Sequence, residues 1–111
     1  MNKFRTHKCN ELRKEKVGDE VTLSGWINKK RDHGNLLFID LRDNYGITQC
    51  IIDKGNSNFK MLEKTQLETV IKIEGKVVER SKESVNNDIE TGEIEVVIKN
   101  FQVLGECKEL P

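Results

Sequence analysis

Residues 25–53 are GWINKKRDHGNLLFIDLRDNYGITQCIID, and this stretch predicts three consecutive strands of one small curved sheet. Apolar and polar residues alternate over residues 20–28 and again over residues 36–43, which is the period of a strand with one buried face. The polar, glycine-containing segment 29–35 predicts a basic turn between these two strands. The stretch therefore indicates a β-protein.

The segments on either side of this stretch complete a five-stranded pattern. Residues 44–46 predict a hairpin loop, residues 47–53 the third strand and residues 59–67 one short helix. Two further alternating runs, residues 70–80 and residues 93–103, predict the fourth and fifth strands. Three strands, a helix and two strands are the order of the OB-fold, a five-stranded Greek-key barrel. A β-sandwich would need more strands.

The length of the chain predicts a single domain. A chain of 111 residues can bury one core but not two. We expect residues 1–111 to form one all-β OB-fold domain with a short N-terminal segment over residues 1–18 and the start of a linker near residues 106–111. Glycines inside the first and fourth strands, Gly25 and Gly75, suit the sharp bends of a small barrel.

The charges of the chain balance as a whole but not along its length. Nineteen basic residues cancel nineteen acidic ones, which argues against a strongly basic, nonspecific nucleic-acid binder. Residues 1–54 carry eleven Lys and Arg against eight Asp and Glu, whereas residues 55–111 carry eight against eleven. This polarity is weak support for an anionic partner at one end.

The cysteines and histidines predict no disulfide and no metal site. Cys9, Cys50 and Cys107 include no C-x-x-C pair, and His7 and His33 lack the spacing of metal ligands. We expect reduced thiols, with Cys50 in the core. Neither a signal peptide nor an apolar run long enough to span a bilayer is present, so a cytoplasmic protein that does not enter membranes is expected.

No group of residues predicts catalysis. The chain has no phosphate-binding glycine loop, and no histidine is placed to activate a serine. The carboxylates are spread as a solvated surface. We therefore expect a binding module without cofactors of its own.

Binding residues are predicted on the outward face of the second and third strands. Phe38 could stack on an unpaired base, and Gln49 could donate to and accept from a base edge. Lys29, Lys30 and Arg31 belong to the loop between the first two strands, which commonly binds oligonucleotides in OB-folds. A second apolar cluster around Phe38 and a merely solvated basic turn are the alternatives.

The same face extends onto the fourth and fifth strands. Arg80, Glu95 and Lys99 share its outward direction, whereas Trp26 is expected to pack under the N-terminal segment. The chain has four Phe, one Trp and one Tyr, and only Phe38 is well placed for stacking. A general single-strand binder needs several such rings, so this surface favours a few displayed bases, as in an RNA loop.

Several segments of the chain together form a recognisable pattern. They are GWINKKRDHG (25–34), LFIDLRD (37–43), GITQ (46–49), TGEIEV (91–96) and, more weakly, RTH (5–7) with Cys9 and Leu12-Arg13. With these segments the chain resembles one family, the N-terminal anticodon-binding domain of bacterial-type aspartyl-tRNA synthetases. The resemblance covers essentially the whole chain. Lysyl and asparaginyl relatives share the fold but differ around the basic turn.

The resemblance implies a role for each residue of the outward face. Phe38 would stack on an anticodon base, and Gln49 would recognise the middle uracil. Arg31 would contact bases or phosphates of the loop. Arg80 and Glu95 would help to recognise the first anticodon base, because a carboxylate can accept from the N1 and N2 protons of guanine.

Two features of the chain depart from the family, the lysines of the turn and the loop over residues 81–86, and a third, His33, varies within it. The family commonly has three arginines where this chain has Lys29, Lys30 and Arg31, so contacts at the two lysines would reach phosphates only. His33 would lie near the third anticodon base and permit recognition of both aspartate and asparagine anticodons, unless it is a turn histidine in solvent. The loop over residues 81–86 is more acidic than the resemblance implies.

The resemblance also implies a larger parent enzyme. A class II catalytic domain would follow this segment and use ATP and Mg²⁺ to attach aspartate to tRNA(Asp) and, through His33, to tRNA(Asn). The parent would be a homodimer, and the domain alone would bind tRNA without activating an amino acid. The alternatives are the anticodon domain of an asparaginyl or lysyl synthetase, an unrelated OB-fold RNA binder, or a protein-interaction module that docks a peptide on Phe38.

Overall fold

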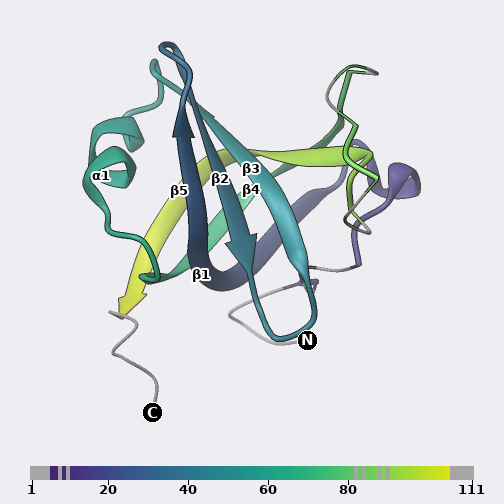
Figure 1. Cartoon of the computed structure of the whole chain (residues 1–111), viewed down its shortest axis with the longest axis horizontal. Helices are drawn as coiled ribbons and strands as arrows, with labels where there is room; N and C mark the ends of the chain where they lie inside the picture. Colours follow the sequence, from purple (N-terminus) through teal and green to yellow (C-terminus); the bar gives the residue numbers. More distant parts are fainter. Residues whose placement is uncertain are drawn as a thin grey trace.

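Five strands and two short helices are found in the computed structural model, which describes Thr6, His7, Cys9 and residues 11–81, 83, 85–87, 89 and 91–105 (Figure 1). In chain order these elements are η1 (Lys14–Lys16), β1 (Glu20–Asp32), β2 (Leu36–Arg42), β3 (Ile47–Asp53), α1 (Phe59–Lys64), β4 (Val70–Glu79) and β5 (Ile94–Gly105). The predicted order of three strands, one helix and two strands is confirmed. Cys107, Arg5 and the linker predicted near residues 106–111 lie outside the described residues.

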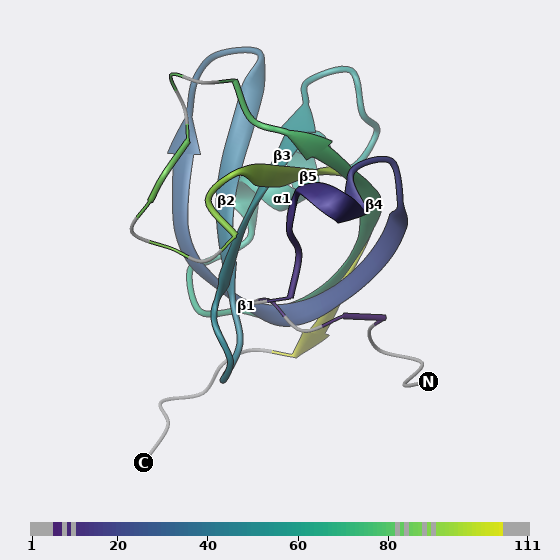
Figure 2. The same ribbon diagram turned by 90° about the vertical axis from the view of Figure 1, so that its right-hand side faces the viewer.

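The strands close into a barrel in the order β1-β2-β3-β5-β4. The long strand β1 pairs antiparallel with both β2 and β4, and Figure 2 shows it sweeping around the barrel between them. The only parallel pairing among the described strands joins β3 to β5, at Cys50 with Val96 and Ile51 with Val97. The predicted OB-fold barrel is confirmed.

The core is made of the alternate residues that the sequence pattern selected. Inward residues of all five strands are buried, and Phe59 and Leu62 of α1 are buried with them. Two glycines permit the barrel to close. A Cβ atom at Gly25 would lie 2.3 Å from the carbonyl oxygen of Arg42, and one at Gly75 would lie 2.2 Å from that of Val97.

Asp43 connects the hairpin loop with the N-terminal segment. Its Oδ1 accepts hydrogen bonds from the backbone N–H groups of Tyr45 (2.8 Å) and Gly46 (3.0 Å), and its Oδ2 accepts one from that of Cys9 (2.9 Å). Thr48 Oγ1 donates to the carbonyl oxygen of Cys9 at 2.6 Å. These bonds hold Cys9 against the barrel.

The basic turn predicted over residues 29–35 is wrong in extent. Strand β1 continues through residues 29–32, which pair with β2, and the connection is reduced to residues 33–35, with Gly34 at φ +78°. The pairing register shifts between Ile27 and Lys29, so Asn28 is an extra, bulged residue. A polar segment can remain a strand here because its side chains find partners on both faces, Arg31 with Gln49 and Lys30 with the end of α1.

The helix is shorter than predicted. It ends at Lys64, and Thr65 is already extended at φ −69° and ψ 133°, so Leu67 lies outside the helix and is exposed. None of the helices in the described residues is long and apolar enough to cross a membrane.

Candidate nucleic-acid interface

The bulge at Asn28 decides which basic side chains face the site. Before it, odd-numbered residues of β1 such as Ile27 point into the core. Because a bulge inserts one residue, the alternation is reversed after it, and Arg31 faces outward beside its partner Phe38 on β2. The neighbouring Lys30 points to the opposite side of the strand.

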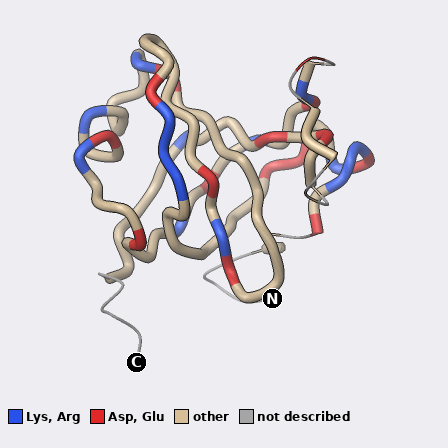
Figure 3. Tube along the Cα trace, in the orientation of Figure 1, with Lys and Arg blue, Asp and Glu red and all other residues tan. Residues whose placement is uncertain are grey.

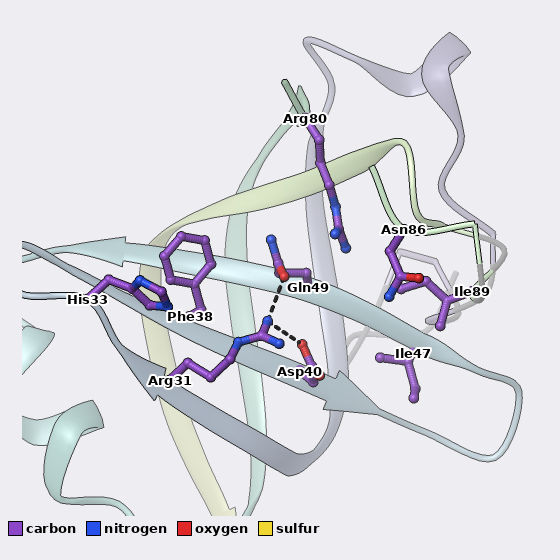
Figure 4. Close-up of a pocket in the computed structure, with 9 residues that line it drawn as sticks. All are labelled: Arg31, His33, Phe38, Asp40, Ile47, Gln49, Arg80, Asn86 and Ile89. Atoms are coloured by element: carbon purple, nitrogen blue, oxygen red, sulfur yellow. Dashed lines mark hydrogen bonds and ion pairs between the residues drawn. The ribbon is translucent and has the colours of Figure 1, made fainter. Parts of the chain in front are cut away.

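Four polar side chains from four strands form one hydrogen-bonded row, hereafter the polar row (Asp40, Arg31, Gln49 and Glu95). Arg31 Nη2 donates to Gln49 Oε1 at 2.7 Å and to Asp40 Oδ1 at 3.3 Å (Figure 4). Gln49 Nε2 donates to Glu95 Oε1 at 2.8 Å. Arg31 accepts nothing and Glu95 donates nothing, so these two partners fix the orientation of the Gln49 amide.

Phe38 lies beside the polar row as a half-buried ring. The edge of the His33 ring meets it with the ring centroids 4.9 Å apart and an interplanar angle of 68°. The guanidinium carbon of Arg31 lies 5.9 Å from the ring centroid, within the range of a cation–π contact. Phe38 is therefore held by its neighbours while part of its surface stays accessible.

Arg80 approaches the polar row from the end of β4. It is 6% exposed, and its Nε donates to the carbonyl oxygen of Ile94 at 2.9 Å. Burial lowers the pKa of Arg80, while the carboxylates of Glu95 and Asp40 raise it and the nearby Arg31 lowers it. Since an arginine keeps its proton far above neutral pH, Arg80 remains a buried cation facing these carboxylates.

The segment between β4 and β5 folds back toward the site. The N–H of Asn86 donates to the carbonyl oxygen of Gly92 at 3.0 Å, and a Cβ at Gly92 would lie only 1.6 Å from the Asn86 oxygen. Thr91 Oγ1 donates to the carbonyl oxygen of Ile47 at 2.5 Å. This closure needs a glycine at position 92, and it brings Asn86 and Ile89 to the site.

These features together enclose a cleft of about 450 Å³ on the outer face of β2 and β3 (Figure 4). Its lining includes His33 of the β1–β2 connection and Asn86 and Ile89 of the segment between β4 and β5. Its volume is that of a small-ligand site. The lining residues are Arg31, His33, Phe38, Asp40, Ile47, Gln49, Arg80, Asn86 and Ile89.

Residues 21–104 match the family model described as the OB-fold nucleic acid binding domain. The chain belongs to this family. In such domains the loops that join the first to the second and the fourth to the fifth strand bind oligonucleotides. The corresponding connections of this OB-fold domain are the two that flank the cleft.

Two similar curated proteins are aspartate–tRNA(Asp/Asn) ligases. The chain is 73% identical to that of Pelagibacter ubique over 111 residues and 50% identical to that of Phenylobacterium zucineum over 111 residues. Each match covers 100% of this chain and 19% of the relative, so the chain spans about a fifth of the length of these relatives. The resemblance to aspartyl-tRNA synthetases is confirmed.

Two similar solved structures share the fold of this chain. The asparaginyl-tRNA synthetase of Pyrococcus horikoshii superposes with a TM-score of 0.75 and 27% identity over 95% of this chain and 24% of that chain. An aspartyl-tRNA synthetase of Entamoeba histolytica has a TM-score of 0.80 over 95% of this chain and 22% of that chain. At 20% identity, the latter supports the fold alone.

Five of the eight predicted site residues of the OB-fold domain line the cleft: Arg31, His33, Phe38, Gln49 and Arg80. Glu95 adjoins it through its bond to Gln49. Lys29 is exposed on β1 and Lys30 contacts helix α1, so neither lines the cleft. What each of the eight does with RNA stays a prediction.

Asp40, Ile47, Asn86 and Ile89 line the cleft although the sequence reasoning did not select them. For Asp40 a signal was present, because it shares the outward direction of Phe38 on β2. For Asn86 and Ile89 the only available signal was Gly92 at the end of a long polar loop, which permits that loop to fold back.

The charges at the cleft of the OB-fold domain nearly balance. Two guanidiniums, Arg31 and Arg80, face two carboxylates, Asp40 and Glu95, so donors and acceptors are nearly balanced. Figure 3 shows basic and acidic residues interspersed along the trace, with one basic run over residues 29–31. Within the described residues, no group of three or more His, Cys, Asp or Glu could hold a metal ion.

Proposed function

We propose that this domain recognises the anticodon loop of a tRNA through the polar row and the Phe38 ring. One unpaired base stacks on Phe38 while neighbouring base edges pair with Gln49 and Glu95. The observation that carries this proposal is the hydrogen-bonded row of side chains beside a half-buried aromatic ring in one cleft. The identity to aspartate–tRNA(Asp/Asn) ligases over the whole chain supports it.

The chemistry of the polar row suits guanine and uracil. Glu95 is an acceptor on both oxygens, and guanine presents two adjacent donors to a carboxylate. Gln49 keeps one further N–H and one further lone pair beyond its bonds to Glu95 and Arg31. Since Gln49 is 5% exposed, only a base that enters the cleft reaches these groups.

The RNA partner that fits is tRNA(Asp), and tRNA(Asn) is the second. Their anticodons, GUC and GUU, share the first two bases and differ in the third. His33, with its ring against Phe38 at the rim of the cleft, is the residue proposed to lie near the third base and to accept both. The curated relatives are named as ligases for both tRNAs, which supports this partner choice.

Aminoacylation belongs to the remainder of the parent protein in this proposal. The relatives are about five times as long as this chain, which leaves room for a catalytic domain that uses aspartate, ATP and Mg²⁺ and forms the expected homodimer. Among the described residues that line the cleft there is no serine, threonine or cysteine nucleophile. The pure domain should therefore show no aspartate-dependent exchange between ATP and pyrophosphate, and measurable exchange would contradict the proposal.

The deciding experiment measures binding of the domain to RNA stem-loops by fluorescence anisotropy. A stem-loop with a GUC anticodon should bind at least about 10-fold more tightly than one with the same stem and a CAG anticodon, as expected for mismatched bases. Affinity should fall steeply with salt through counterion release. Equal affinities for both stem-loops would refute anticodon recognition, and a salt-independent affinity would favour an apolar protein interface.

A further inference from the structure

The end of β1 that carries Arg31 lies at an edge of the sheet. Strand β1 pairs with β4 only as far as Trp26, opposite Val70. Beyond the bulge at Asn28, Lys29 to Asp32 pair with β2 alone. A bulge followed by an edge segment is a place where a strand can twist, so the direction of Arg31 is not fixed by backbone pairing on both sides.

Lys30 ties this edge segment to the end of helix α1. Its ammonium group donates to the carbonyl oxygens of Glu63 at 2.7 Å, Leu62 at 3.5 Å and Thr65. A lysine ammonium has three donors, and here each has an acceptor. The last carbonyl oxygens of a helix point away from it and its end is partially negative, so a cation is favoured there.

The helix end is itself firmly placed. Leu62 is fully buried in the core, and the backbone N–H of Thr65 donates to the Leu62 carbonyl oxygen at 3.1 Å. Lys30 therefore links the edge of the sheet to an element fixed by hydrophobic packing. This contact adds to the pairing of Lys30 with Ile39 of β2.

Lys30 and Arg31 project from opposite faces of the strand, as successive residues must. We propose that Lys30 is a positioning residue: by binding the end of α1 it holds the bulged end of β1 so that Arg31 reaches Gln49 and Asp40, and it makes no contact with RNA. This proposal rests on the proposed function for its RNA readout. It gives the three consecutive cations different tasks, with Lys30 facing the helix, Arg31 facing the cleft and Lys29 exposed.

The salt dependence of RNA binding separates positioning from direct contact. Each phosphate contact contributes roughly 0.7 to the slope of log affinity against log salt for single strands. We expect Lys30→Met to weaken binding of the GUC stem-loop about 3- to 10-fold with an unchanged slope, as for neighbouring residues that are coupled. Lys29→Met applies the same two measurements to the adjacent exposed lysine. Lys60→Met, on the exposed first turn of α1, should change neither the affinity for the stem-loop nor the salt slope.

A double-mutant cycle tests whether Lys30 acts through Arg31. If it does, Lys30→Met should cost little in an Arg31→Ala background, because the group it positions is gone. Lys30→Arg keeps donors for the helix carbonyls and should restore most of the affinity. A loss that is equal with and without Arg31, or a slope reduced by about one phosphate contact, would overturn the proposal.

A measurement without RNA keeps the two proposals distinguishable. In nitrogen-15 spectra, the Arg31 side-chain N–H signals of the free domain should broaden or move in Lys30→Met and stay unchanged in Lys60→Met. Unchanged Arg31 signals in a folded Lys30→Met domain would overturn the positioning role. Failure of the unaltered domain to bind any stem-loop would instead refute the proposed function. If Lys30→Met does not fold, Lys30→Gln, which keeps two donors, replaces it in all arms.

Discussion

Gln49 on β3 and Glu95 on β5 are joined by a 2.8 Å hydrogen bond in which the amide nitrogen donates to the carboxylate. With Arg31 donating to the other side of the amide, Gln49 has one fixed orientation before any ligand arrives. A site whose side chains are already oriented loses less entropy on binding. The bond also places the Glu95 carboxyl group beside the cleft as a hydrogen-bond acceptor.

The first prediction concerns Glu95→Gln. The substitution removes the charged acceptor proposed for guanine, and a hydrogen bond to a charged group contributes about 1.5–3 kcal/mol. Binding of the GUC stem-loop should weaken about 10- to 100-fold. Inosine lacks the 2-amino donor of guanine, so the unaltered domain should prefer GUC to IUC and the variant should lose that preference. Anisotropy titrations with both stem-loops measure it.

Glu93→Gln is the matched control for Glu95→Gln. Glu93 lies two residues earlier and is 3.9 Å from the Lys14 ammonium, on an exposed part of the surface. Its substitution should leave both affinities within about 2-fold, because exposed ion pairs contribute little. Equal losses in the two variants would show that overall charge, and not the position of Glu95, determines binding.

The second prediction concerns Phe38→Ala. Loss of a stacking platform should weaken stem-loop binding by about 1–3 kcal/mol per base. Phe38→Leu keeps apolar bulk without the flat ring and should recover only part of the loss. Tyr45→Ala removes an exposed aromatic outside the cleft and should have no effect on affinity. If Phe38→Leu binds as tightly as the unaltered domain, the ring does not stack.

The outward face could be predicted because period two follows directly from strand geometry. Once Leu37, Ile39 and Leu41 are assigned to the core, Phe38 and Asp40 must face outward. The same reasoning placed Gln49 on that face. It did not predict that Gln49 is almost buried and bonded to Arg31 and Glu95, because these partners come from other strands.

The role of Lys30 and the extent of β1 could not be predicted in this way. The alternation of apolar and polar residues predicts which face of the sheet a side chain lies on only while the pairing register is unbroken. The bulge at Asn28 reverses that alternation, and an asparagine is not a residue type that marks a bulge in the sequence. A lysine beside an arginine looks equally solvated in the sequence. The carbonyls that bind Lys30 become its neighbours only when residues 62–65 return to the barrel.

The third prediction concerns His33→Ala and the choice between two anticodons. In the proposal the unaltered domain binds GUC and GUU stem-loops with similar affinity. Removing the imidazole should lower the affinity for GUU about 3- to 10-fold more than the affinity for GUC. Competition titrations of the two stem-loops give the ratio directly. A preference of the unaltered domain for GUC of about 100-fold or more would refute dual recognition.

The fourth prediction concerns stability at the bend of β1. Gly25→Ala places a Cβ atom 2.3 Å from the Arg42 carbonyl oxygen, which cannot move without breaking the β1–β2 pairing. Unfolding free energy should fall by about 2–4 kcal/mol, as for other overpacked backbone contacts. Gly105→Ala, where no atom lies within 4 Å of the new Cβ, should stay within about 0.5 kcal/mol. Thermal melts that show equal midpoints for the two variants would contradict this account.

The last prediction concerns pH and the Cys50 thiol. Burial raises the pKa of Cys50, with a further increase from the carboxylates of Asp40 and Glu95, so the folded protein keeps this proton above the ordinary value of 9.0. The unfolded chain loses it there, so the folded state binds more protons and stability falls as pH rises beyond about 9. The slope contributed by this one group is at most about 1.4 kcal/mol per pH unit. Cys50→Ala should show a shallower loss of stability between about pH 9 and 11 in urea titrations. Identical slopes for the two proteins, or alkylation of Cys50 by iodoacetamide in the folded protein at pH 8, would show that the thiol ionises in the native state.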